Sequence, residues 1–175
     1  MRLHAVVDVA HPLDRVFATY RDELPALVPY LPNVREITVR SRTEHGALVE
    51  LVNHWVGGAD LPAVARRFIS EDLLAWDDHA RWDAQARVCH WRTEVAAFRD
   101  ALRAEGETRF TAAGPSATRV HIDGVIEVDA RKVRLVPRIF AGQVGPAVEA
   151  FLVKTITPNL VAVAEAVGRR LSEAA

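Results

Sequence analysis

The C-terminal part of the chain has apolar residues at the spacing of one long amphipathic helix, and the segments before it are short and have the periodicity of strands. Apolar residues recur at helical spacing from Pro146 to about Ser172, and proline suits the first turn of a helix. We therefore expect a long C-terminal helix that buries one face. The stripe consists of Val148, Phe151, Leu152, Ile156, Leu160, Val163, Val167 and Leu171.

The segments before this helix alternate between apolar and polar residues, as half-buried strands do. The clearest alternation lies in residues 117–129, where Val120, Ile122, Ile126 and Val128 share one face. Residues 62–70 and 98–105 are compatible with either a strand or a helix. The same pattern predicts further strands at residues 3–9, 34–42, 47–56, 73–83, 88–96 and 106–114.

Prolines separate the first predicted strand from the second and predict two short helices between them. The first helix is expected to begin near Pro12, with Asp14 near its positive end. Pro25, Pro29 and Pro32 are too closely spaced for a long helix, so we expect one or two helical turns and then a turn at Pro32.

The stretch LLAWDDHARWDAQARVCHW contains three tryptophans, two histidines and the only cysteine. In two extended strands these residues divide between two faces, because alternate side chains point to opposite sides. Asp78 then shares the apolar face with the tryptophans, and Asp77 lies opposite. A four-residue loop after Asp83 gives a register that places large residues opposite small ones, and Asp77 opposite Glu94. The predicted inner pairs are Trp82–Cys89, Ala80–Trp91, Asp78–Thr93 and Trp76–Val95.

The same division argues against a metal site in this stretch. Asp78 points away from Asp77 and His79, and Arg81 and Arg92 share the face of those two residues. Tight sites for transition metals need three or four converging ligands. We therefore expect no metal and no other cofactor.

The composition restricts the partners and the location. A chain of 175 residues fits one domain, spanning residues 1–175. With 22 basic and 23 acidic residues the net charge is -1, so no overall field attracts nucleic acid and we expect no such partner. Residues 1–14 lack the long apolar run of a signal peptide or a membrane span, so we expect a cytoplasmic protein. Cys89 has no second cysteine to pair with and is expected to pack in the core.

Three stretches of the chain resemble the START-like (SRPBCC) helix-grip superfamily, which includes polyketide cyclases, lipid-transfer domains and plant pathogenesis-related allergens. They are PLDRVFATYRDELPALVPYLPNVREITV, LLAWDDHARWDAQARVCHW, and TRVHIDGVIEVD followed by the long helix. The resemblance covers nearly the whole chain and is carried by hydrophobicity and spacing, without a catalytic signature. It implies an α+β helix-grip fold, in which a curved antiparallel sheet of about seven strands wraps around a long C-terminal helix, with two short helices after the first strand.

Members of this superfamily hold a ligand in a cavity between the sheet and the last helix. A helix with its side chains is only about 10 Å across, so one helix cannot fill a concave sheet of six or seven strands. The resemblance therefore implies binding or transport of a small hydrophobic ligand such as a lipid, a sterol or a polyketide. We expect a carrier that is non-enzymatic or weakly enzymatic. A polyketide cyclase, aromatase or dehydratase is one alternative, and a protein-interaction module that forms a homodimer is another.

The residues expected to line the cavity lie on the predicted inner face. Asp78 is the candidate catalytic residue among them, because an unpaired carboxylate on a buried face is costly. A hydrogen bond to Thr93, a bulge that turns the side chain outward, or exposure at the sheet edge would each explain it. A cavity acid with a raised pKa is the functional alternative. The expected ligand-binding residues are Trp76, Asp78, Trp82, Trp91, Thr93, Phe110, Ile122 and Phe151.

Overall fold

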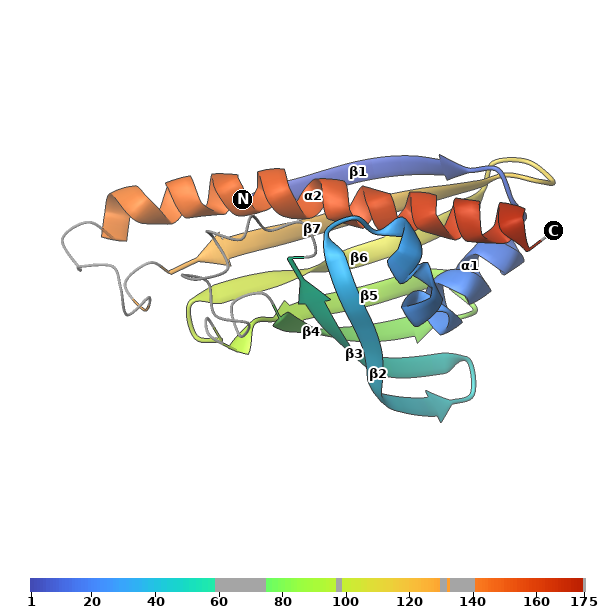
Figure 1. The fold of residues 1–175 in the computed structure, drawn as a ribbon, viewed down its shortest axis with the longest axis horizontal. Coiled ribbons are helices and arrows are strands. Elements are labelled where there is room, and N and C mark those ends of the chain that lie inside the picture. Colours follow the sequence, from blue (N-terminus) through green and yellow to red (C-terminus); the bar gives the residue numbers. More distant parts are fainter. Residues whose placement is uncertain (59–74, 97–98, 130–131, 133–140, 175) are drawn as a thin grey trace.

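The computed structural model describes residues 1–58, 75–96, 99–129, 132 and 141–174, and of residues 141–156 it describes the backbone. Its centre is one antiparallel sheet with the strand order β1-β7-β6-β5-β4-β3-β2 (Figure 1). The seven strands are β1 (Arg2–Val9), β2 (Val34–His45), β3 (Leu48–Gly57), β4 (Ala75–Asp83), β5 (Val88–Glu94), β6 (Leu102–Ala112) and β7 (Thr118–Val128). The helices are α1 (Leu13–Asp22), the short 3-10 helix η1 (Leu24–Tyr30) and α2 (Ala141–Glu173).

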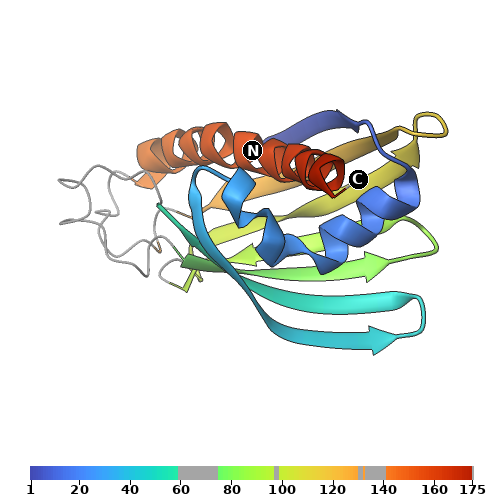
Figure 2. The same cartoon turned by 45° about the vertical axis from the view of Figure 1, so that its right-hand side comes forward.

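The sheet curves around α2, and this arrangement confirms the predicted helix-grip fold (Figures 1 and 2). Strand β1 pairs with β7, so the first strand of the chain lies beside the last one. Helix α2 packs against these two strands and, near its C-terminal end, against α1 and η1. Within the described residues, the inner face of the sheet is the face that is turned toward the helices.

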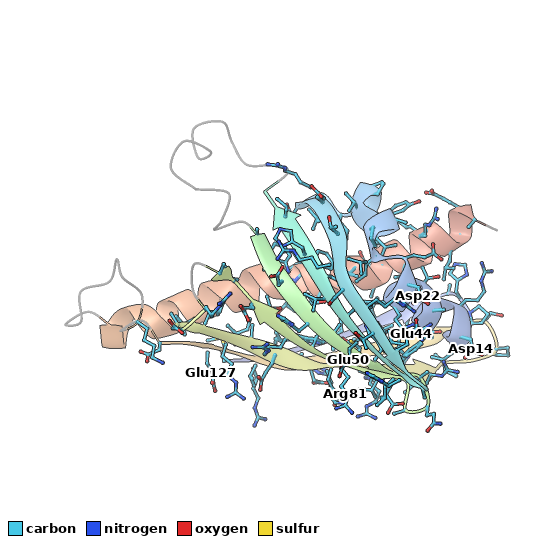
Figure 3. The ribbon with its side chains drawn as sticks, turned by 90° about the horizontal axis from the view of Figure 1, so that it is seen from below. Asp14, Asp22, Glu44, Glu50, Arg81 and Glu127 are labelled. Carbon is cyan, nitrogen blue, oxygen red and sulfur yellow. The ribbon has the colours of Figure 1, made fainter. Side chains whose placement is uncertain are left out.

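Helix α1 covers one end of that inner face. Pro12 precedes its first residue, as predicted, and the side chains of Val16, Phe17 and Tyr20 are buried beneath it. Ion pairs join the helix to the sheet and to the loop between β4 and β5: Asp22 lies 2.8 Å from Arg42 on β2, and Asp14 lies 2.7 Å from Arg87 in that loop. Figure 3 shows both acids near this end of the molecule. Exposed ion pairs stabilise little, so the buried face of α1 carries most of the attachment.

The central hairpin adopts the predicted register. The inner pairs Trp82–Cys89, Ala80–Trp91 and Asp78–Thr93 are present, and Asp77 lies opposite Glu94 on the outer face. The ladder ends at that pair, so the fourth predicted inner pair, Trp76–Val95, does not form. The loop of residues 84–87 is fixed by the Asp83 carboxylate, which accepts hydrogen bonds of 2.9 Å from the backbone N–H groups of Gln85 and Ala86.

Two element boundaries differ from those that the sequence pattern predicts. Helix α2 begins at Ala141, five residues before Pro146, and continues through Pro158. Strand β6 already begins at Leu102, so the later part of the ambiguous segment 98–105 is strand. Residues 62–70 lie outside the described residues. No helix in the described part of the chain has both the length and the apolar character that a membrane span requires.

Candidate functional site

The candidate site is a row of three polar side chains on the inner face of the sheet. Asn53 on β3 lies opposite Asp78 on β4, and Asp78 lies opposite Thr93 on β5. Because alternate residues of a strand point to opposite faces, all three side chains project from the same side as the tryptophans. We call Asn53, Asp78 and Thr93 the polar band.

Asp78 is held by Asn53. The Nδ2 group of Asn53 donates a hydrogen bond of 3.4 Å to Oδ2 of Asp78. Asn53 is fully buried, whereas Asp78 and Thr93 are only partly buried. The expected hydrogen bond between Asp78 and Thr93 is not the one that forms, because the side chain of Asp78 is joined to the neighbouring strand on its other side.

The surroundings of Asp78 favour its protonated form. Removal of the carboxyl group from water raises its pKa from 3.8 to about 6, and the hydrogen bond from Asn53 partly opposes that rise. A carboxyl group with such a pKa exchanges its proton close to neutral pH. Burial also raises the pKa of Cys89 and of Tyr20, and the Asp78 carboxylate adds to both shifts.

One end of the inner face is closed by aromatic packing beneath α1. The ring of Phe17 meets those of Trp82 and Phe110 edge-on, with centroids 5.3 and 5.2 Å apart, and Tyr20 contacts the same two rings. Trp82, Phe110 and Ile122 are almost completely buried. These three predicted site residues therefore make packing contacts in the core.

Toward the other end of the inner face, the side chains become more accessible. Along β4, Ala80 and Trp82 are buried, whereas Trp76 and Asp78 are partly exposed. Trp76 stacks on Trp55 of β3 with the ring centroids 5.7 Å apart and the planes 13° from parallel. The face thus changes from closed core to accessible surface along the length of β4.

The outer face of the hairpin carries the charged residues. Asp77 accepts a hydrogen bond of 2.8 Å from Arg40 and lies 2.7 Å from Nδ1 of His54, while His79 lies 3.8 Å from Glu94. Asp77 and His79 therefore have separate partners. In the described parts of the chain, no three His, Cys, Asp or Glu side chains are placed to hold a metal ion together.

A broad hollow of about 910 Å³ lies on this outer face, away from the polar band. Several of the polar side chains that line it lie close to one another, such as His4 and Asp123 at 2.7 Å and His90 and Glu107 at 3.9 Å. Figure 3 shows the charged residues Glu50, Arg81 and Glu127 on the same side of the sheet. Exposed, paired charges are typical of a solvated sheet face, so the hollow does not indicate a ligand. It is lined by Arg2, Leu3, His4, His79, His90, Trp91, Arg92, Glu105, Gly106, Glu107, Asp123, Gly124 and Val125.

The structure groups some of the residues expected at the site and adds two. Trp76, Asp78 and Thr93 lie together at the accessible end of the inner face, whereas the side chain of Phe151 lies outside the described residues. Asn53 and Trp55 were not among the expected site residues. Their signal is present in the segment ALVELVNHWV, where both have the parity of the apolar residues.

The family assignment rests on a match that covers nearly the whole chain. Residues 4–167 match the family described as "Protein of unknown function (DUF2505)". The chain belongs to the DUF2505 family. None of the curated proteins matches this DUF2505 chain significantly.

Solved structures with the same fold share little sequence with this DUF2505 protein. TTHA0849 from Thermus thermophilus is 22% identical with a TM-score of 0.69, and the alignment covers 100% of this chain and 99% of that one. The Zhui aromatase/cyclase from Streptomyces sp. R1128 is 17% identical with a TM-score of 0.68, covering 97% and 92%. A START superfamily protein from Mycobacterium smegmatis is 14% identical with a TM-score of 0.57, covering 99% of both chains. At these identities the likeness establishes the START-like fold alone.

Proposed function

We propose that this protein binds a small, mostly apolar molecule between the inner face of the sheet and α2. The observation that carries the proposal is the change along β4 from closed aromatic core to a partly exposed inner surface, where Trp76 stacks on the buried ring of Trp55. Binding sites for small molecules are concave and mostly apolar, with a few well-placed polar groups. The inner face supplies both kinds of group.

The proposal narrows the set of residues that would contact the ligand. Trp76, Asp78 and Thr93 are accessible, and Trp55 completes the stack beside them. Trp82, Phe110 and Ile122 would support this surface from within the core. Trp91 would lie between the residues that contact the ligand and the core residues that support them, because it is buried and pairs with Ala80 on β4.

Tryptophan fluorescence and native mass spectrometry test this proposal. We expect a neutral apolar dye, N-phenyl-1-naphthylamine, to bind and to quench the tryptophan emission, and members of a panel of fatty acids, sterols and aromatic polyketides to displace it. Trp76→Ala is expected to weaken dye binding by tenfold or more, because it removes an aromatic surface at the accessible end.

His79→Ala is the matched control, because this ring is on the same strand and projects from the outer face. It is expected to leave dye binding unchanged. If the dye neither binds to the protein nor shifts its mass, and no member of the panel does so, the proposed function is wrong.

A polyketide cyclase or aromatase is the second candidate function, and it is favoured by one observation. The Asp78 carboxyl group lies on an aromatic face and has a pKa raised to about 6 by its removal from water, which suits a general acid or base. A linear poly-β-ketone thioester is the appropriate test substrate. Cyclisation that depends on Asp78 is expected to fall at least a hundredfold in Asp78→Asn, and unchanged turnover in that variant would exclude the role.

The remaining partner predictions concern larger molecules. The near-neutral charge supports a protein that does not bind nucleic acid. A homodimer and a cytoplasmic location stay predictions. Light scattering at high protein concentration tests the first, and a strictly monomeric mass would contradict it.

A further inference from the structure

The polar band interrupts the apolar inner face of β3, β4 and β5. On one side of it lies the row of Leu51, Ala80 and Trp91, and on the other lie Trp55 and Trp76. Directly opposed side chains on neighbouring strands have Cβ atoms about 4.5–5.5 Å apart. Asp78 is therefore close to both of the other members, and Asp78 and Thr93 are close enough to contact one small group.

The hydrogen-bonding capacity of the band is only partly used. Asn53 donates to Oδ2 of Asp78, and among the described residues no group hydrogen-bonds to Oδ1 of Asp78 or to the Thr93 hydroxyl. The Oδ1 atom of Asn53 is buried and also lacks a partner there. Buried polar groups are normally satisfied, so this arrangement calls for an explanation.

The three residues of the polar band differ in whether a ligand can contact them. Asn53 is completely buried, so it cannot contact a ligand in this arrangement of the side chains. Asp78 and Thr93 keep accessible surface on the same face. Asn53 can therefore act only through Asp78, by fixing the orientation of its carboxyl group.

We propose that the polar band makes the inner site selective for ligands that carry a hydroxyl group, with Asp78 and Thr93 as the contacting residues and Asn53 as a positioning residue. This inference rests on the proposed function, because it concerns the same site. A ligand hydroxyl has one donor and two acceptor positions. It donates to the free oxygen of Asp78 and accepts from the Thr93 hydroxyl, which satisfies the unused capacity of both groups.

The selectivity follows from the cost of burying polar groups. A ligand of the same shape with a methyl group in place of the hydroxyl would displace water from Asp78 and Thr93 and return no hydrogen bond. Sites built to hydrogen-bond a hydroxyl reject analogues that lack it far more strongly than apolar pockets reject a small change in size. The expected preference is tenfold or more.

A pair of matched probes tests the inference. 2-Naphthol and 2-methylnaphthalene differ by a hydroxyl in place of a methyl group, and both are measured by displacement of N-phenyl-1-naphthylamine at pH 8, where Asp78 is ionised. We expect the wild-type protein to bind 2-naphthol at least tenfold more tightly. Asn53→Leu is expected to reduce this ratio to threefold or less, with little change for 2-methylnaphthalene.

Two further variants separate positioning from a merely structural effect. The double variant Asn53→Leu with Asp78→Leu removes the whole pair, so it should bind 2-methylnaphthalene at least as tightly as the wild type and show no preference. Asp77→Asn is the matched control, because this neighbouring carboxylate faces outward, and it should keep the full preference. Loss of affinity for both probes by the same factor in Asn53→Leu would show that Asn53 acts on stability alone.

The outcomes distinguish the two proposals. If the dye binds but the wild-type protein does not discriminate between the probes, the hydroxyl selectivity is wrong and the proposed function stands. If the preference survives in Asn53→Leu, the positioning role of Asn53 is wrong. If neither the dye nor either probe binds, both proposals are overturned.

Discussion

The indole ring of Trp91 occupies the space that a side chain at Gly106 would need. A Cβ atom built on Gly106 would lie 2.5 Å from Cζ2 of Trp91, and one on Gly124 would lie 2.8 Å from Cη2 of the same ring. Gly106 and Gly124 are directly opposed on β6 and β7, and Trp91 pairs with Gly106 from β5. Two glycines on adjacent strands thus form the seat of one tryptophan on the inner face.

Gly106→Ala is therefore expected to destabilise the protein by about 3 kcal/mol, because overpacking in a close-packed interior forces side chains or backbone to shift. The added carbon would also lie 2.2 Å from the carbonyl oxygen of Asp123, which is backbone and cannot move freely. Urea denaturation monitored by circular dichroism measures the change. Gly46→Ala is the control, since nothing lies within 4 Å there and only its positive φ of 62° adds a cost of about 1 kcal/mol. Equal losses in the two variants would contradict the seat at Gly106.

The aromatic cluster beneath α1 is expected to be the most sensitive part of the core. Phe17 contacts Trp82 and Phe110 edge-on, and the guanidinium of Arg87 lies 5.2 Å from its ring centroid. Phe17→Ala should lower the free energy of unfolding by about 3–5 kcal/mol, because it leaves a cavity that rigid neighbours cannot fill. The urea midpoint measures this loss. Val6→Ala, at an exposed position on β1, should change the same quantity by less than about 0.5 kcal/mol, and a comparable loss in both variants would speak against the cluster as the anchor of α1.

The sequence predicted the register of the central hairpin and three of its four inner pairs, because the possibilities were few. A strand has only two faces, and a slip of one residue would have turned Asp78 and the tryptophans to the solvent. The alternation defined which residues share a face and left slips by two residues possible, and the structure has the register that the four-residue loop predicted. This register places Asp77 and Asp78 on opposite faces of the sheet. For that reason the acids and histidines of this stretch cannot converge on one metal ion.

The partner of Asp78 could not be predicted in the same way. Each inner strand has two neighbours, and the hairpin defined only β5, on which Thr93 was the expected partner. Asn53 lies on β3, which is joined to β4 through residues 59–74 outside the described part, and the sequence alone does not fix that pairing. The contact of Trp91 with Gly106 and Gly124 could not be predicted for the same reason. It depends on the register of three strands, β5, β6 and β7.

Cys89 is expected to be unreactive in the folded protein. Its side chain is buried, and its pKa is raised by removal from water and by the nearby Asp78 carboxylate, so little thiolate is present at neutral pH. A disulfide reagent such as 5,5′-dithiobis(2-nitrobenzoate) should therefore not react with the native chain within the time that suffices for the unfolded one. In concentrated guanidinium chloride one thiol per chain should react, since the sequence has one cysteine. Rapid labelling of the native protein would contradict the burial of this strand.

Asp78 should also affect how the stability of the protein depends on pH. Its pKa is raised from 3.8 to about 6 in the folded state, so the folded protein holds this proton more tightly than the unfolded chain does. The stability due to this group is fully present below about pH 4 and is lost as the pH rises through 6. Asp78→Asn keeps a neutral side chain at every pH. The variant should therefore become more stable than the wild type by about 1–3 kcal/mol at pH 8, with the difference shrinking toward pH 4.

Urea titrations at a series of pH values between 4 and 8 measure this difference, and the neighbouring acid provides the control. Asp77 is paired with Arg40 and His54 on the outer face, so Asp77→Asn removes a favourable interaction instead of an unfavourable burial. That variant should be less stable than the wild type by up to about 1 kcal/mol near neutral pH. Two adjacent aspartates would then respond to the same substitution with opposite signs because they face opposite sides of one strand. A destabilised Asp78→Asn protein at pH 8 would mean that the Asp78 carboxylate is satisfied by a partner, and that it is not available to a ligand.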